Sequence, residues 1–279
     1  MVDDEKYILL IDEIKRLYIG HVGVQENLCV EKEKKFSKFC DELHTLYEVE
    51  KENIFNGYIK PFINEYTFIE DTSSLQVINK LHYETYHSLF LKYILDSQNS
   101  FGHEVLREFL SNVADNKSWF ENLSLCTYNV HEEVSTKGLK NGNNQKRIDL
   151  LFVDDKNKWC IVIENKIDSE VHYHGDNKRS QLDFYYDYCE RTYKDYEKLY
   201  ILLSYNEKNS SHKRAGWEYA DYYDVFKSLL KHHSKDALVN DYLKTLFKLL
   251  FPNETMNSYQ RSSLYRGRKF YSNIIQKIK

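Results

Sequence analysis

The chain of 279 residues contains only 2 prolines and 9 glycines. Both residue types interrupt regular secondary structure, so their scarcity favours long helices and few irregular loops. The sequence also lacks a continuous run of about 18 apolar residues, the length that a membrane-spanning helix needs. We therefore expect no membrane span.

Cysteine is sparse and irregularly placed, at positions 29, 40, 126, 160 and 189. The number is odd, and no two cysteines have the spacing of a zinc knuckle or of a redox-active disulfide motif. This pattern argues against a zinc site and against a disulfide framework. We therefore expect reduced thiols in a cytoplasmic protein.

The chain also has no excess of positive charge. It contains 39 Lys and Arg and 43 Asp and Glu, which gives a net charge of −4. Any contact with nucleic acid must therefore come from local basic patches. The hydrophobic share of 42% and the charged share of 29% are typical of globular proteins with a packed core. The length suits one large domain, or a domain with a substantial extension.

Two apolar runs near the middle of the chain carry unexpected charges. Residues 148–153 form the first run and include Asp149, and a polar turn follows at residues 154–157. Residues 159–163 form the second run and lead into Glu164, Asn165 and Lys166. This pattern predicts a β-hairpin. Charged groups inside its strands are costly to bury unless other groups pair with them.

Strand alternation predicts where these charges lie. Glu164 and Lys166 share one face of their strand, because successive side chains point to opposite faces. If Asp149 lies across the hairpin on the same face, two carboxylates and a lysine converge, which suits Mg²⁺ or Mn²⁺ better than zinc. The alternative is a surface hairpin with solvated charges. The apolar surroundings of both acids favour the metal site.

The order of these motifs resembles that of the PD-(D/E)XK nuclease superfamily. Ile148-Asp149, with isoleucine at the place of the proline, precedes the Glu164-Asn165-Lys166 motif. Gln181 and Tyr185 then form a Gln-x-x-x-Tyr element similar to that of the RecB-like branch. An upstream Glu-x-x-His-Ser stretch, residues 84–88, is similar to the opening of a bacterial branch whose members are mostly uncharacterised.

The resemblance implies a function and a site. It implies hydrolysis of phosphodiester bonds with Mg²⁺, or Mn²⁺ as a substitute, on DNA, in bacterial or phage defence, restriction or repair. RNA or a nucleotide is the alternative substrate. The implied metal ligands are Asp149, Glu164, Glu84 and the backbone carbonyl of Asn165. Lys166 would serve the attacking water, and Gln181 would orient that water or the scissile phosphate. The alternative is a catalytically silent nucleic-acid- or protein-binding module with the same fold. The sequence does not decide whether the protein forms a homodimer, and it identifies no protein partner.

The implied fold is α/β, with a central mixed β-sheet flanked by helices as in a restriction-endonuclease-like core. We expect strands at 123–134 and 199–204 beside the hairpin, a short strand at 217–219, and helices at 82–97, 180–192, 221–232 and 237–251. A further helix is expected from Gly102.

We divide the chain into a helical N-terminal extension (1–75), a nuclease-like domain (76–252) and a basic aromatic segment (253–279). In the extension, the periodicity predicts helices at 4–19 and 26–53. We expect Gly57 and Pro61 to end this helical section, and residues 70–74 to form a linker. The alternatives for the charged run 31–35 are a protein-interaction arm or coiled coil and an ordinary solvated helix face. We favour the solvated face, because heptad spacing does not persist around the run.

Three further residues have open roles. His87 is interpreted as a structural histidine, because a lone histidine beside aromatic residues is more often structural than catalytic. Glu133 is a candidate additional carboxylate of the site. Glu132 is interpreted as a solvated residue at the strand end.

Basic and aromatic side chains beside the site and in the C-terminal segment are candidates for nucleic-acid contact. The loop at residues 136–146 is rich in Gly, Asn and Lys, and after Glu254 the chain has six Lys or Arg and no acid. An ordinary loop and an amphipathic terminal helix are the alternatives. The predicted nucleic-acid-binding residues are Lys140, Lys146, Arg147, Lys178, Arg179, Tyr185, Arg266, Arg268 and Lys269. For Tyr185, packing is the alternative.

Overall fold

The computed structural model of the protein describes residues 4–21, 26–113, 123–125, 127–136, 146–171, 173–174, 179–205 and 216–250. These residues form two compact units. One contains the chain up to Thr67, and the other runs from Phe68 to Leu250. The domain limits given above stay a prediction, and the basic segment 253–279 lies outside the described residues.

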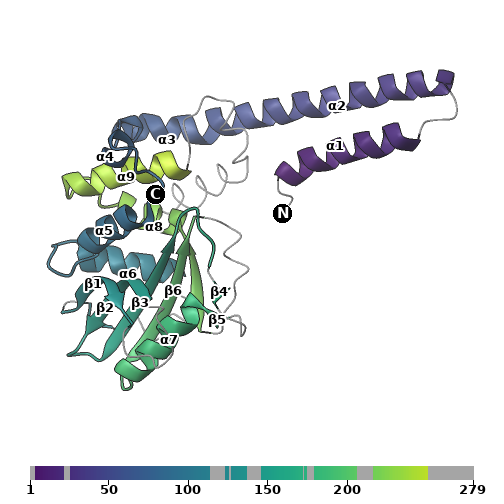
Figure 1. Cartoon of the computed structure of the whole chain (residues 1–279). Helices are drawn as coiled ribbons and strands as arrows, with labels where there is room; N and C mark the ends of the chain where they lie inside the picture. Colours follow the sequence, from purple (N-terminus) through teal and green to yellow (C-terminus); the bar gives the residue numbers. More distant parts are fainter. Residues whose placement is uncertain are drawn as a thin grey trace. The chain divides into compact units, whose positions relative to one another are not determined.

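The N-terminal unit is helical (Figure 1). It contains α1 (Asp4–His21), α2 (Glu26–Ile54), a π-helical turn η1 (Phe55–Ile59) and α3 (Lys60–Glu65). The predicted end of the helical section at Gly57 and Pro61 is therefore wrong. Gly57 lies within the π-helical turn, and Pro61 lies in the first turn of α3, where the N–H that proline lacks would have no intrahelical acceptor. In the described part of the chain, no helix is both long and apolar enough to cross a membrane.

The predicted linker at 70–74 is also wrong. This stretch joins a 3₁₀ turn, η2 (Thr67–Glu70), to a short helix, α4 (Ser74–Val77). Ser73 caps α4 by accepting a hydrogen bond from the backbone N–H of Gln76, and it is buried. The Lys248 ammonium donates to the carbonyl of Glu70 at 2.8 Å. Ser and Asp are common in linkers, but the same residues cap helices and turns, so composition alone did not separate the two.

A mixed five-stranded sheet forms the centre of the second unit, as predicted. Its order is β1-β2-β3-β6-β7, where β1 to β3 are antiparallel neighbours and β3, β6 and β7 are parallel. The strands are β1 (Asn129–Ser135), β2 (Arg147–Asp154), β3 (Trp159–Lys166), β6 (Glu197–Ser204) and β7 (Trp217–Asp221). A separate two-stranded ladder joins β4 (Tyr173–His174) to β5 (Arg179–Ser180).

The first strand begins later than predicted, at Asn129 instead of Leu123. Before it, backbone carbonyls of the described residues accept hydrogen bonds from side chains. Ser97 donates to the carbonyl of Tyr128 at 2.6 Å, and the indole N–H of Trp159 donates to the carbonyl of Ser124 at 3.4 Å. The apolar residues of this stretch therefore anchor it to the core without extending the sheet.

Helices cover both faces of the sheet (Figure 1). On one face, α7 (Gln181–Thr192) packs Leu182 and Cys189 against Val162 and Leu202. The helices α5 (Glu84–Ile94), α6 (Gly102–Val113), α8 (Tyr222–Leu230) and α9 (Ala237–Leu250) form the opposite layer. Because side chains alternate along β3, each residue of this strand faces either α7 or the four-helix layer.

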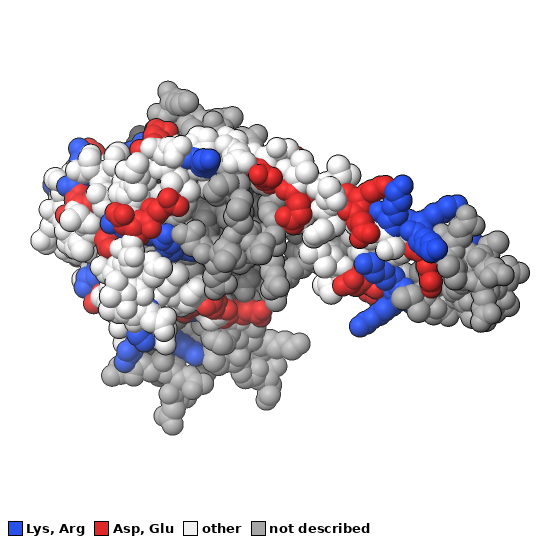
Figure 2. Space-filling model, turned by 90° about the horizontal axis from the view of Figure 1, so that it is seen from above, with Lys and Arg blue, Asp and Glu red and all other residues white. Residues whose placement is uncertain are grey.

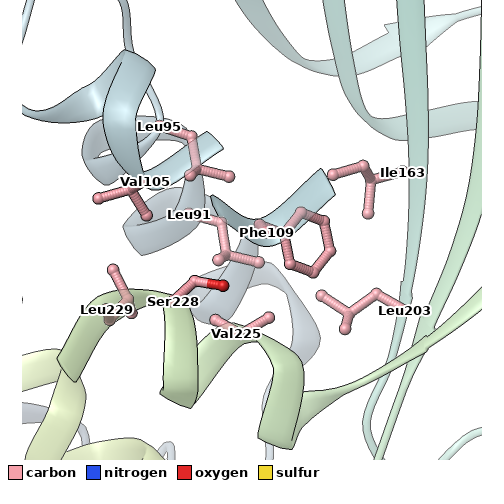
Figure 3. A pocket seen from close by; sticks show the side chains of 9 residues that line it. All are labelled: Leu91, Leu95, Val105, Phe109, Ile163, Leu203, Val225, Ser228 and Leu229. Atoms are coloured by element: carbon pink, nitrogen blue, oxygen red, sulfur yellow. The ribbon is translucent and has the colours of Figure 1, made fainter. Parts of the chain in front are cut away.

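A small hollow lies inside the four-helix layer, where α5, α6 and α8 meet β3 and β6 (Figure 3). Its lining is apolar except for Ser228, whose hydroxyl donates to the carbonyl of Asp224 at 2.7 Å. Because the Ser228 hydroxyl already donates this bond, the hollow has little polar surface to bind a ligand. We interpret the hollow as a gap in the packing of the core. Its lining residues are Leu91, Leu95, Val105, Phe109, Ile163, Leu203, Val225, Ser228 and Leu229.

Candidate active site

The hairpin that carries the site is fixed at its turn by Asp154. One carboxylate oxygen accepts the backbone N–H groups of Lys156 and Asn157 at 2.9 and 2.8 Å. The other oxygen accepts the Thr127 hydroxyl and the Asn157 side-chain amide, both at 2.9 Å. Burial alone would raise the pKa of Asp154, but these hydrogen bonds outweigh it and lower the pKa. The turn therefore holds an ionised aspartate that fixes the register of the two strands.

That register brings the charged residues together. Leu150 pairs with Ile163, so the next position along each strand sets Asp149 opposite Glu164 on the face that α7 covers. Lys166 follows on the same face, and its ammonium lies 2.6 Å from Glu164 Oε1. The predicted convergence of two carboxylates and a lysine is thus present in the structure.

Asp149 is half-buried beside the backbone of the next strand. Its Oδ2 accepts the N–H of Asn165 at 2.7 Å. Burial raises the pKa of Asp149 to about 6, and the charges of Glu133 and Glu84 act in the same direction against the lowering effects of Lys166 and this hydrogen bond. The surroundings of Asp149 therefore disfavour the ionised form of its carboxyl group.

Glu164 is almost completely buried, with 1% of its surface exposed. Its Oε1 accepts hydrogen bonds from Lys166 and from the side-chain amide of Gln181, whereas Oε2 is buried and has no hydrogen-bond partner in the described part of the chain. Burial, followed by the charge of Asp149, raises the pKa of Glu164. Burial would lower the pKa of Lys166, but Glu164, Asp149 and Glu84 outweigh it and raise that pKa. Three carboxyl groups therefore surround one ammonium.

Glu84 closes the site from the first turn of α5. Its Oε1 accepts the N–H of Ile167 at 2.9 Å and the hydroxyl of Ser169 at 2.7 Å. Its Oε2 lies 3.8 Å from the Lys166 ammonium. In this conformation Glu84 holds the chain just after β3 and adds negative charge near Lys166. Its role as a direct metal ligand stays a prediction.

The side chain of Asn165 points to the opposite layer and is held there by three hydrogen bonds. Its amide donates to the Ser88 hydroxyl at 3.1 Å and to the carbonyl of Glu84 at 3.2 Å. Its Oδ1 accepts the hydroxyl of Tyr222 at 2.5 Å. These bonds fix the peptide units between Glu164 and Lys166. Sequence reasoning missed Tyr222, which follows the capping residue of α8 and carries no motif of its own.

His87 supports the same network from behind. It is buried, with Nε2 2.8 Å from the carbonyl of Leu81 and Nδ1 3.1 Å from the hydroxyl of Tyr242. The carbonyl requires a proton on Nε2, so Nδ1 accepts from the tyrosine. Burial lowers the pKa of His87 to about 4, so the ring is neutral at physiological pH. The interpretation of His87 as a structural residue agrees with these contacts.

The start of α7 supplies two predicted residues with different placements. A capping box of Ser180 and Asp183 begins the helix. Gln181 points to Glu164, as a residue of the site should. Tyr185 is only 3% exposed, and its hydroxyl donates to the carbonyl of Arg147 at 2.6 Å. The expected contact of Tyr185 with nucleic acid conflicts with this burial, because the face of α7 that carries it packs on the sheet.

The two glutamates of β1 differ. Glu132 lies 3.1 Å from the ammonium of Lys92, and one of its carboxylate oxygens is buried, so it is not simply solvated. Glu133 lies between Glu132 and Val134, which pair with Leu150 and Ile148 of β2, and it has a left-handed backbone with φ of 50°. This conformation is rare for residues other than glycine. The carboxylate of Glu133 is 3.4 Å from the guanidinium of Arg147.

The predicted nucleic-acid-binding residues are only partly described. Arg147 is exposed at the start of β2, and Arg179 is exposed, paired with Asp187 and stacked 4.7 Å from the ring of Phe184. The carbonyl of Lys146 accepts the backbone N–H of Thr136 at 3.0 Å. Their role in binding stays a prediction. Lys140, Lys178, Arg266, Arg268 and Lys269 lie outside the described residues.

The donor set fits a magnesium ion. In the described part of the chain, no three His, Cys, Asp or Glu side chains are grouped closely enough to hold a metal ion. Magnesium is typically bound by one or two carboxylates with several water molecules. Asp149, Glu164 with its unpartnered Oε2, and the Asn165 carbonyl make up such a set. A divalent cation would also offset the surplus of carboxyl groups around Lys166.

Comparison with known proteins agrees with this geometry. A family model described as the PD-(D/E)XK nuclease superfamily matches residues 73–248. Searches of curated proteins and of solved structures gave no match. The matched segment covers more than half of the chain, including every strand of the central sheet and all residues of the charged cluster. The chain therefore belongs to the PD-(D/E)XK nuclease superfamily.

Proposed function

We propose that the protein is a metal-dependent nuclease that hydrolyses phosphodiester bonds in DNA, with Mg²⁺ as its natural cofactor and Mn²⁺ as a substitute. One observation carries the proposal. The buried Oε2 of Glu164 has no hydrogen-bond partner among the described residues and lies on the strand face that also presents Asp149. A buried carboxylate oxygen without a partner is unfavourable unless a cation binds it.

In this proposal Asp149, Glu164 and the carbonyl of Asn165 hold the ion. When bound, the ion activates a water molecule and neutralises charge that develops on the phosphate. The hydrogen bond from the Asn165 N–H orients Asp149, and the bond from Gln181 orients Glu164. The chain thus fixes both carboxylates before any ligand arrives, which reduces the reorganisation needed on binding.

Lys166 acts in this proposal as a donor of hydrogen bonds. Its raised pKa keeps the ammonium protonated at neutral pH, so it orients the attacking water and donates to the phosphate oxygens instead of removing a proton. Glu84 holds the chain after β3 through Ile167 and Ser169 and keeps Lys166 at the site.

We further propose that exposed basic residues at the edges of the site grip the DNA backbone. Arg147 begins the strand that carries Asp149, and Arg179 precedes the helix that carries Gln181. Both therefore have the charge and the exposure that phosphate contact requires. The free thiols of Cys160 and Cys189 are consistent with a reducing, cytoplasmic setting. Defence, restriction or repair in a bacterium is the corresponding proposed role.

The test is a cleavage assay with Mg²⁺ or Mn²⁺ on single- and double-stranded DNA and on RNA. Lys166→Ala should abolish cleavage, and Lys156→Ala, an exposed lysine in the turn of the same hairpin, should leave it unchanged. Cleavage of RNA alone would refute the proposed substrate. Binding of DNA without cleavage, together with a melting temperature that Mg²⁺ does not raise, would show a catalytically silent module.

A further inference from the structure

The outer part of α2 exposes three large apolar side chains on one side of the helix. Phe39 is 53% exposed, Leu46 is 65% exposed and Val49 is 51% exposed. Residues seven apart and three apart lie close together on a helix surface, so the three side chains form one stripe. The sequence favoured an ordinary solvated helix over a protein-interaction arm, whereas this row of exposed hydrophobic residues, which follows the charged run 31–35 along the helix, favours the interaction arm.

The preceding helix shows the same feature. Leu10, Ile14 and Leu17 of α1 follow at helical spacing and are exposed, and so are Ile8 and Leu9. In proteins, most of the stability of a helix comes from packing of its apolar face. Helices with this much uncovered apolar surface therefore require a partner.

The charges of α2 indicate what that partner is. Residues 32–38 contain four lysines and one glutamate, whereas residues 41–52 contain five acids and one lysine. In Figure 2 the Lys and Arg side chains of this helical part gather toward its outer end, where acidic side chains lie among them. A helix whose two halves carry opposite charge is complementary to a second copy of itself in antiparallel orientation.

We propose that two copies of the chain associate through an antiparallel pairing of α2. A two-fold axis beside residues 42 and 43 sets Phe39 of one copy against Leu46 of the second copy, and by symmetry Leu46 against Phe39. The same register sets the basic half of each α2 beside the acidic half of the other copy. Apolar contacts thus form the centre of the seam, and opposite charges meet on both sides of it.

The basic C-terminal segment of the same chain fits the stripe less well. That segment carries six cations and no acid after Glu254, so it complements only the acidic half of α2. It would repel the four lysines at 32–38, which border Phe39. A second copy complements both halves at once, and this difference decides between the two occupants.

The first experiment measures the mass of the full-length protein by sedimentation over a wide range of concentrations. We expect a dimer that weakens as salt rises, because salt screens the charged flanks. Leu46→Glu should raise the dimer dissociation constant at least about tenfold, since it buries a charge in the seam. Ser37→Glu introduces the same charge on another side of α2 and should leave the dimer intact. Both positions are exposed, so neither substitution removes core packing.

The second experiment tests the orientation. Protein with Lys32→Glu and Lys35→Glu has a weakly acidic half in place of the basic half of α2, and protein with Glu48→Lys, Glu50→Lys and Glu52→Lys has a basic half in place of the acidic one. Each variant alone should be monomeric, and an equal mixture of the two should form a heterodimer. A wild-type protein that stays monomeric at every concentration would overturn the proposal. So would Leu46→Glu protein that keeps the wild-type mass but melts at a lower temperature, because the stripe would then be covered within one chain.

Discussion

Replacing Asp149 by asparagine should make the metal-free protein more stable above about pH 6. The environment of Asp149 raises its pKa from 3.8 to about 6, so the ionised form is disfavoured in the folded state. Asparagine has the same shape and retains an oxygen to accept the N–H of Asn165. The substitution thus removes the unfavourable charge and leaves the contact.

The size of the effect follows from the pKa. Each pKa unit corresponds to about 1.4 kcal/mol, so the difference between 3.8 and about 6 sets an upper limit of ~3 kcal/mol. Because the side chain keeps some contact with water, we expect about 2 kcal/mol. For a protein of this size that gain corresponds to a melting temperature higher by roughly 4–8 °C.

The pH dependence has a definite sign. Below about pH 4, Asp149 is protonated in both the folded and the unfolded protein, so the variant gains nothing. Between pH 4 and pH 6 the folded protein retains a proton that the unfolded chain releases, and the stability of the wild type falls relative to the variant. Above pH 6 the difference reaches its full value.

The assay is a series of melting curves at pH 4 to 8 in a chelator, with and without added Mg²⁺. Asp154→Asn is the matched control on the same strand, because hydrogen bonds lower the pKa of Asp154 and its ionised form stabilises the turn. That variant should be less stable by about 1–3 kcal/mol at pH 7. Magnesium should raise the melting temperature of the wild type and not that of Asp149→Asn. Loss of stability in Asp149→Asn at pH 7 without metal would refute the reasoning.

Three further outcomes can be checked. Tyr222→Phe removes the hydrogen bond to Asn165 and should lower kcat about tenfold without changing KM, as single-turnover and steady-state kinetics would show. Glu133→Gly should stabilise the protein by roughly 1 kcal/mol in urea unfolding, because glycine adopts a φ of 50° without strain, whereas Glu133→Ala should not. Arg147→Ala should weaken binding of duplex DNA in the absence of metal and flatten its salt dependence, and an unchanged slope would exclude a phosphate contact at this residue.

The sequence predicted the hairpin and its charged face correctly because both depend on local rules. The run from Ile148 and the run ending at Lys166 have strand character, and a polar turn separates them. A period of two then decides that Glu164 and Lys166 share a face. The sequence did not determine the register of the hairpin, because turn length alone does not fix how two strands pair. It predicted only that the charges converge if Asp149 lies opposite Glu164.

The features of the site that the sequence did not predict depend on contacts between residues that are distant in the chain. Tyr222 lies 57 residues from Asn165 and Tyr242 lies 155 residues from His87, and no local pattern connects either pair. For Tyr185 the sequence allowed both packing and contact with nucleic acid, because the motif does not state which face of α7 meets the sheet. The strand before Asn129 was predicted too long, since apolar composition does not reveal whether the backbone finds a ladder partner.

The central strand β3 has consequences for any attempt to alter this protein. All eight of its residues, Trp159–Lys166, are buried, so no position on it faces solvent. Each substitution there changes either the α7 layer or the four-helix layer, and a random library over this strand would mostly return proteins that do not fold. Substitutions meant to leave the core intact are therefore better placed at exposed positions outside this strand, such as Glu133, Arg147 and Arg179.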